Sequence, residues 1–147
     1  MTRSPATMAA LQAALQAEQA ASYGYGIVGA HLGQGSARQA VATADWTAHL
    51  AAAEKLSSMI STLGGTPAPA AVAYQLPSPV RTAADAVTLA WTLEDAVARA
   101  YLGLVALPQL TLRRFGADQV RAAALRAEAW RGSTQAFPGL PATSLRS

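Results

Sequence analysis

The stretch that decides the fold is GGTPAPAAVAYQLPSPVR, Gly64–Arg81, which stands between two long helical segments. Prolines at positions 67, 69, 77 and 79 favour an extended chain here rather than another helix. An extended chain of this length can reach about 60 Å, whereas the helix expected before it, at 36–63, is about 42 Å long. The stretch can therefore run the length of a helical bundle, so that the helices before and after it are parallel.

Helix start and stop signals divide the rest of the chain into four helices. Ser4-Pro5 and Ser36 are N-cap signals, and Thr82 with Asp85 resembles a capping box. Glycines close the first two helices, and Pro108 opens the last one. We expect a single domain, 1–147, with helices at 5–32, 36–63, 82–107 and 109–131. Because the first and last connections are short, each pair forms an antiparallel hairpin, and two hairpins joined by a long crossover are the ferritin-like form of a four-helix bundle.

The composition agrees with an all-α protein and excludes several other classes. Alanine makes up about a quarter of the chain, hydrophobic residues 52% and charged residues only 13%, which disfavours disorder. With no cysteine, the chain has no disulfide framework, thiol catalysis or Cys-ligated metal. The net charge of +3 comes from scattered cations, of which only Arg113 and Arg114 are adjacent, so we expect no nucleic-acid partner. No uncharged apolar stretch approaches ~20 residues, so we expect no membrane span and a cytoplasmic protein.

Three of the expected helices carry one ionisable residue in the middle of an otherwise apolar seam. These residues are Glu18, His49 and Glu94. An ionised side chain that loses water in a bundle interior needs a partner or a changed protonation state. Tyr25 follows Glu18 by seven residues and Tyr101 follows Glu94 by seven, which places each phenol two turns from its carboxylate on the same face. The pattern predicts a buried polar cluster.

The lengths of the turns predict which of these residues meet within a hairpin. A turn centred between Gly33 and Gln34 places Glu18 opposite His49. For the second hairpin two registers stay open. If the last helix begins directly at Pro108, Arg121 lies opposite Glu94 and neutralises it; if it begins after Gly116, Glu128 is the neighbour.

Several segments are similar to an actinobacterial ferritin-like domain family of unknown function. The resemblance covers nearly the whole chain and implies a ferritin-like four-helix bundle without an established activity. It lies in EQAASYGYG at Glu18–Gly26, in Tyr74-Gln75-Leu76-Pro77, in Leu93-Glu94-Asp95 with Tyr101, and in Trp130 with Phe137-Pro138-Gly139-Leu140.

Ferritin-like di-iron sites take a Glu from each of two helices and a Glu-x-x-His motif from each of the other two. By this resemblance Glu18 and Glu94 match the two single carboxylates and His49 matches one histidine. The residue three before His49 is Trp46 rather than Glu, while Asp45 lies four before it.

The last helix departs from this pattern as well. Glu128 matches its carboxylate, but Arg131 stands where its histidine should be. The set Glu18, His49, Glu94, Glu128 and Asp45 therefore describes an alternative, degenerate site for iron or manganese rather than a complete di-iron centre.

Three hypotheses follow. The first, which we favour, is a non-catalytic structural, binding or interaction protein with no cofactor and no catalytic residue. In this hypothesis the buried polar cluster fills the place of a ferritin-like metal site. Its members are Glu18, His49, Glu94, Arg121, Tyr25 and Tyr101. The second is a metal-binding bundle with redox or oxidase activity. The third is a small-molecule binder with Tyr25, Tyr101 and Trp46 as cavity walls. Alanine-rich helices leave shallow surfaces, so a homodimer is compatible with each hypothesis.

Overall fold

The computed structural model describes residues 4–132 as four helices without a strand, which confirms the predicted all-α four-helix bundle. They are α1 (Pro5–Ala30), α2 (Ala37–Thr62), α3 (Ala83–Val105) and α4 (Leu110–Arg131), and each end lies within two residues of its expected position. Side chains at the predicted positions cap three of the helices. Ser4 accepts a hydrogen bond from the Thr7 N–H, Ser36 from the Gln39 N–H, and Thr82 forms a full capping box with Asp85.

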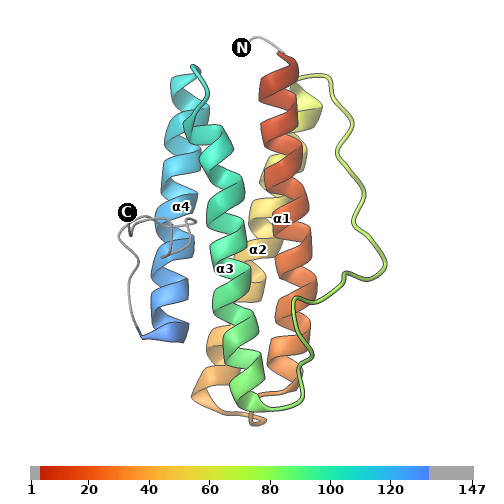
Figure 1. Ribbon diagram of the computed structural model, residues 1–147. Coiled ribbons are helices and arrows are strands. Elements are labelled where there is room, and N and C mark those ends of the chain that lie inside the picture. Colours follow the sequence, from red (N-terminus) through yellow and green to blue (C-terminus); the bar gives the residue numbers. More distant parts are fainter. Residues whose placement is uncertain (1–3, 133–147) are drawn as a thin grey trace.

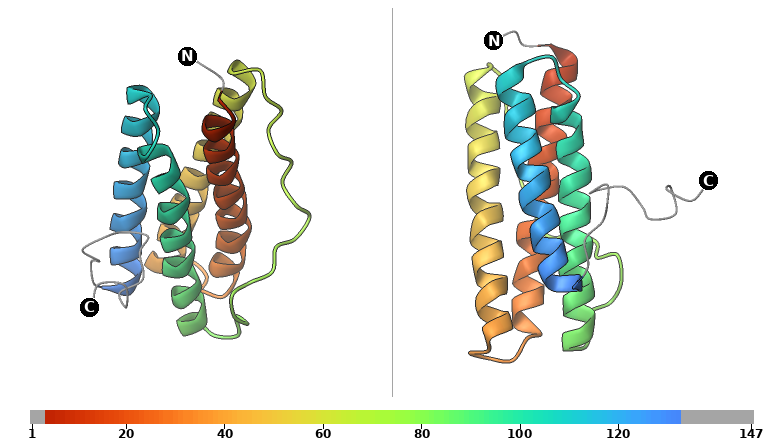
Figure 2. Two further views of the ribbon diagram at one scale, coloured as in Figure 1. Left: turned by 45° about the horizontal axis from the view of Figure 1, so that its top comes forward. Right: turned by 90° about the vertical axis from the view of Figure 1, so that its left-hand side faces the viewer.

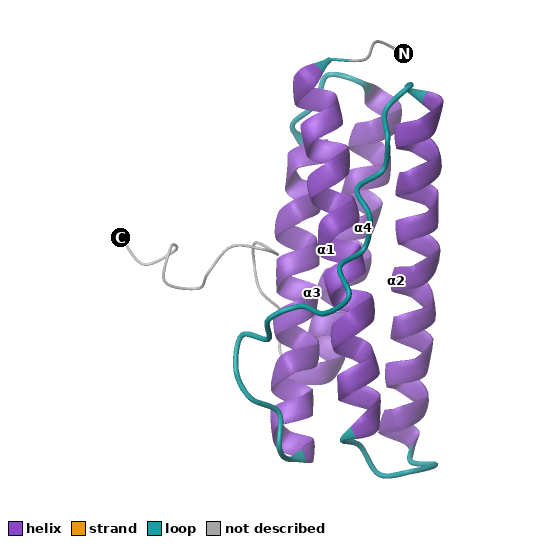
Figure 3. Cartoon of the chain, turned by 90° about the vertical axis from the view of Figure 1, so that its right-hand side faces the viewer, coloured by secondary structure: helices purple, strands orange, loops and turns teal. Residues whose placement is uncertain are grey.

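The four helices form two antiparallel hairpins, α1–α2 and α3–α4, which pack on each other chiefly through α1 and α3 (Figures 1 and 2). The crossover begins at the end of α2 and runs back along the bundle to the start of α3, so that α2 and α3 are parallel (Figures 1 and 3). This direction is the one that the length of Gly64–Arg81 predicts. No helix among residues 4–132 combines the length and the apolar character that a membrane span requires.

Side chains of α1 hold the crossover in place. The Gln12 amide donates to the Thr66 carbonyl at 2.7 Å and accepts from the Ala68 N–H at 2.9 Å. Gln19 donates to the Ala68 carbonyl at 2.8 Å. An extended segment has no internal backbone hydrogen bonds, so these glutamines satisfy polar groups that would otherwise rely on water.

Two apolar clusters fill the interior, one toward each end of the bundle. The first is built around Leu11, Leu56 and Leu104, and the second around Val28 and Leu89. Glu18, His49 and Glu94 are also fully buried, at 0% exposure, and come from the middle of α1, α2 and α3. A polar layer therefore separates the two halves of the core.

A glycine sets the register of the second hairpin. A Cβ on Gly116 of α4 would lie 2.8 Å from the Leu104 Cβ and 3.1 Å from the Tyr101 carbonyl oxygen. The absence of a side chain at Gly116 thus allows α4 to approach the backbone of α3. This contact places Gly116 opposite Leu104.

We expect the same substitution at two glycines to have opposite effects. Gly116→Ala should lower the free energy of unfolding by roughly 1–2 kcal/mol, because the backbones of α3 and α4 must separate. Gly26→Ala should raise it by up to ~1 kcal/mol, because nothing lies within 4 Å of the added Cβ and alanine is the better helix former. Urea unfolding of both variants measures the difference; equal effects would contradict the assigned register.

Candidate functional site

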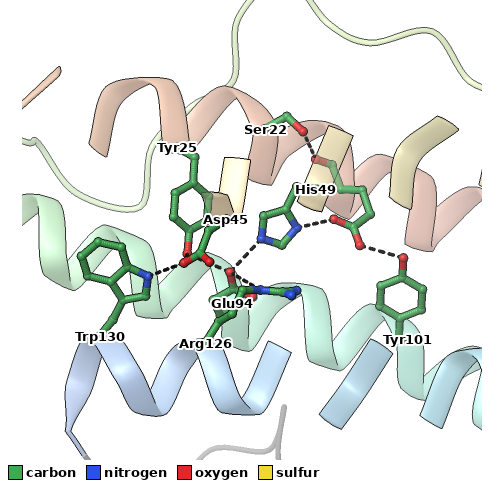
Figure 4. A network of polar contacts seen from close by, with 9 residues as sticks. Ser22, Tyr25, Asp45, His49, Glu94, Tyr101, Arg126 and Trp130 are labelled. Carbon is green, nitrogen blue, oxygen red and sulfur yellow. Dashed lines mark hydrogen bonds and ion pairs between the residues drawn. The ribbon is translucent and has the colours of Figure 1, made fainter. Parts of the chain in front are cut away.

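The centre of the polar layer is His49, which contacts a different glutamate through each ring nitrogen (Figure 4). Nδ1 lies 2.5 Å from Glu18 Oε2 and Nε2 lies 2.7 Å from Glu94 Oε1. The expected pairing of Glu18 with His49 is therefore present, and His49 additionally reaches across to the second hairpin. Three helices meet at this one imidazole.

Each glutamate is also bonded to a tyrosine of the other hairpin. The Tyr101 hydroxyl donates to Glu18 Oε1 at 2.7 Å, and the Tyr25 hydroxyl donates to Glu94 Oε1 at 2.7 Å. In the sequence Tyr25 shares α1 with Glu18, and Tyr101 shares α3 with Glu94. The hydrogen bonds instead cross between α1 and α3. The two tyrosines thereby tie the hairpins together.

The cation next to Glu94 is Arg126, not Arg121. Arg126 Nε lies 3.0 Å from Glu94 Oε1, whereas Arg121 is exposed on the outer side of α4. The predicted pairing was wrong because Gly116 packs opposite Leu104: Glu94 lies ten residues before Leu104, and Arg126 lies ten residues after Gly116. The close approach allowed by Gly116 was the signal in the sequence that could have identified Arg126.

The other α4 candidate, Glu128, does not join the network. It is half-buried, and its backbone carbonyl accepts the Gly132 N–H that ends the helix. The carboxylate that the alternative metal reading assigned to the last helix is therefore not beside His49.

Asp45 and Trp46 differ from their expected roles. Trp46, expected as a wall of a cavity, is 41% exposed. Asp45, expected as a ligand in the alternative metal site, instead accepts a hydrogen bond from Trp130 Nε1 at 2.8 Å. The Tyr25 hydroxyl lies 3.3 Å from Asp45 Oδ2, so Asp45 extends the network toward α4. The residue four before His49 thus faces the network and the residue three before it does not.

The environment of His49 favours its charged form. Burial alone would lower its pKa, but the hydrogen bonds that Glu18 and Glu94 accept from the ring, together with their negative charges, outweigh burial and raise the pKa to about 9. The ring is thus an imidazolium at neutral pH and donates from both nitrogens. With Arg126, whose pKa is also raised by Glu94 against the effect of burial, two cations face the two glutamates.

The pKa values of Tyr25, Tyr101 and Asp45 are shifted toward the neutral form. Burial, reinforced by Glu94 and Glu18 respectively, raises the pKa of Tyr25 and Tyr101 far above the ordinary value. Burial also raises the pKa of Asp45, against the lowering effect of the Trp130 hydrogen bond. Neither phenol is a base near neutrality.

These residues do not fit a metal ion as they stand. The two nitrogens of His49 point in different directions, so Glu18 and Glu94 flank the ring instead of converging on one point. Arg126 adds a fixed positive charge at Glu94 Oε1, while Glu94 Oε2 is buried without a hydrogen-bond partner. Among residues 4–132 no three His, Asp or Glu side chains are arranged to hold a metal.

A shallow hollow of about 290 Å³ lies outside the layer, where Tyr25, Gly26, Gly29 and Trp46 form part of its lining. Tyr101, expected as a wall of the same cavity, instead belongs to the apolar cluster at the other end of the bundle. The residues proposed for a small-molecule cavity therefore do not surround one space.

Comparison with known proteins places the chain in a family. A model described as a domain of unknown function (DUF4439) matches residues 10–142. The chain belongs to this family. Within DUF4439 the match extends past α4 and includes the Phe137-Pro138-Gly139-Leu140 motif, which lies outside the described residues.

The DUF4439 fold is also similar to a solved structure. The crystal structure of a conserved hypothetical protein, Rv2844, from Mycobacterium tuberculosis is 32% identical in sequence and superposes with a TM-score of 0.83. The similarity covers 89% of this chain and 98% of that one. A comparison with curated proteins finds no match.

Proposed function

We propose that this protein is a non-catalytic ferritin-like bundle, with a structural or interaction role, in which a network of charged side chains takes the place of a metal centre. The observation that carries the proposal is the position of the His49 ring, which is held between Glu18 and Glu94 at 2.5 and 2.7 Å. In this arrangement the cation between the carboxylates belongs to the protein itself. No resident cofactor is part of the proposal.

The connection to ferritin-like proteins rests on topology and on partial matches to their ligand positions. Two antiparallel hairpins with a long crossover are shared, and carboxylates stand at mid-helix on α1 and α3. The two Glu-x-x-His motifs are incomplete, because Trp46 precedes His49 by three residues and Arg131 follows Glu128 by three. Arg126 then supplies positive charge beside Glu94.

The same network argues for a structural task. Glu18, His49 and Glu94 have no exposed surface. The network approaches solvent through Arg126, at 19% side-chain exposure, and through half-buried Asp45. A buried polar layer with several paired charges favours one register of the helices over its alternatives, because any slip leaves charges unpaired. Such a layer suits a rigid scaffold that presents its outer faces to partners.

Metal analysis and thermal unfolding test the proposal together. Protein purified without chelators should contain no stoichiometric iron, manganese or zinc by elemental analysis. Adding each ion to the chelated protein should leave the melting temperature unchanged, whereas a folded-state site at 100 times its Kd would add about 2.7 kcal/mol of stability. One equivalent of bound metal, lost in His49→Gln and retained in His31→Gln, would replace this proposal with the metal-binding reading.

A further inference from the structure

The outer face of the second hairpin carries an apolar hollow that nothing within residues 4–132 covers. The hollow, of about 410 Å³, is lined by Leu102 and Val105 of α3 and by Val120 and Leu125 of α4, with Arg121 as the charged side chain of its lining. Leu125 is 54% exposed. A partner that covers this surface would bury Leu125 together with the apolar lining of the hollow beside it.

Two residues of α4 with opposite charges flank Ala124 and Leu125. Arg121 lies within the lining of the hollow and Glu128 lies beyond it. Because they are seven residues apart, which is two helical turns, both lie on the same side of α4. Within residues 4–132 neither side chain takes part in an ion pair. Ala124 and Leu125 lie midway between them.

We propose that this face binds a second copy of the chain, with the two α4 helices antiparallel about a two-fold axis beside Ala124 and Leu125. In such a pair, residues equally far from the axis on either side face each other. Arg121 would therefore lie opposite Glu128 of the second copy, and the pairing would occur twice by symmetry. Leu125 would pack against Ala124 and Leu125 of the other copy, at the edge of its apolar hollow.

The proposal commits to a second copy because the surface is complementary to itself. An antiparallel two-fold contact pairs residues that lie equally far on either side of its axis, and Arg121 and Glu128 form such a pair, of opposite charge, about Ala124 and Leu125. The overlap from residue 117 to residue 132 is about 22 Å long, which suits a contact of modest area. The dimer surface is separate from the buried network, so the dimer proposal does not depend on the proposed function.

Charge reversal tests the pairing. Sedimentation equilibrium of the full chain should show a concentration-dependent dimer. R121E and E128R should each weaken dimerisation by roughly tenfold or more, because each places like charges opposite one another at both ends of the contact. The double variant R121E/E128R should restore it, because the pairs form again with their signs exchanged.

A charge reversal outside the proposed contact serves as the control. Arg114 is exposed and lies earlier on α4 than the proposed overlap, so the R114E variant should dimerise like the wild type. Circular dichroism of each variant at a concentration where it is monomeric should show unchanged helix content, since both residues lie on the outer side of α4. A wild type that stays monomeric at millimolar concentration, or single reversals that do not weaken the dimer, would overturn the proposal. A double variant that fails to recover would overturn the assigned pairing.

Discussion

Replacing Arg126 with methionine should lower the free energy of unfolding by about 3–5 kcal/mol, the largest effect that we expect from a single substitution in this chain. The Arg126 Nε lies 3.0 Å from Glu94 Oε1, and the Glu94 side chain has no exposure to solvent. Without Arg126, the two buried glutamates would share the single positive charge of His49. Methionine keeps much of the buried length of the arginine stem, so the loss reports on charge more than on packing.

A second substitution tests whether the unpaired charge of Glu94 causes this loss of stability. Glu94→Gln in the Arg126→Met background removes the carboxylate that lost its partner, so the double variant should be more stable than Arg126→Met alone. Arg114→Met, an exposed arginine on the same helix, serves as the control and should change stability by no more than ~0.5 kcal/mol. Urea unfolding at pH 7 measures all of these variants. An unchanged midpoint for Arg126→Met would mean that the Arg126–Glu94 pair contributes nothing to the fold.

The architecture was predictable because it depends on local signals and on lengths. Capping residues such as Ser4, Ser36 and Thr82 act within one helical turn, so their effect can be read without knowing the neighbours. The length of Gly64–Arg81 decides between a short turn and a crossover without any side-chain detail. The contact of Glu18 with His49 was predictable because Gly33 and Gly35 mark the position of the first turn, whereas Pro108 and Gly116 offer two possible starts for the last helix.

The rest of the site depended on contacts between distant segments. The position of α4 along α3 follows from the close approach at Gly116. The four-residue connection between these helices does not determine that position. The choice between Asp45 and Trp46 was decided by Trp130, which is far away in the sequence. The contact of His49 with Glu94 requires the two hairpins to be placed relative to each other, and no single helix encodes that placement.

The protein should lose on the order of 3 kcal/mol of stability between pH 6 and pH 10 because of His49 alone. Its pKa is about 9 in the folded chain, against about 6.5 for a histidine in an unfolded one. A group whose pKa rises on folding stabilises the fold fully below its unfolded pKa, and this contribution disappears as the pH rises through the folded value. The expected loss therefore begins near pH 6.5 and is most of the way complete by pH 9.5.

Urea unfolding of the wild type and of two histidine variants across pH 6–9.5 tests this expectation. Stopping at pH 9.5 keeps the window below the titration of ordinary tyrosines, since Tyr25 and Tyr101 remain neutral when folded and would add their own destabilisation at higher pH. His49→Gln should be less stable than the wild type at pH 6 and should show a much shallower pH dependence. His31→Gln, at the exposed end of α1, should keep the wild-type slope. A wild type whose stability is flat over this range would show that His49 is neutral in the native protein, and the charge network would then rest on Arg126 as its only cation among residues 4–132.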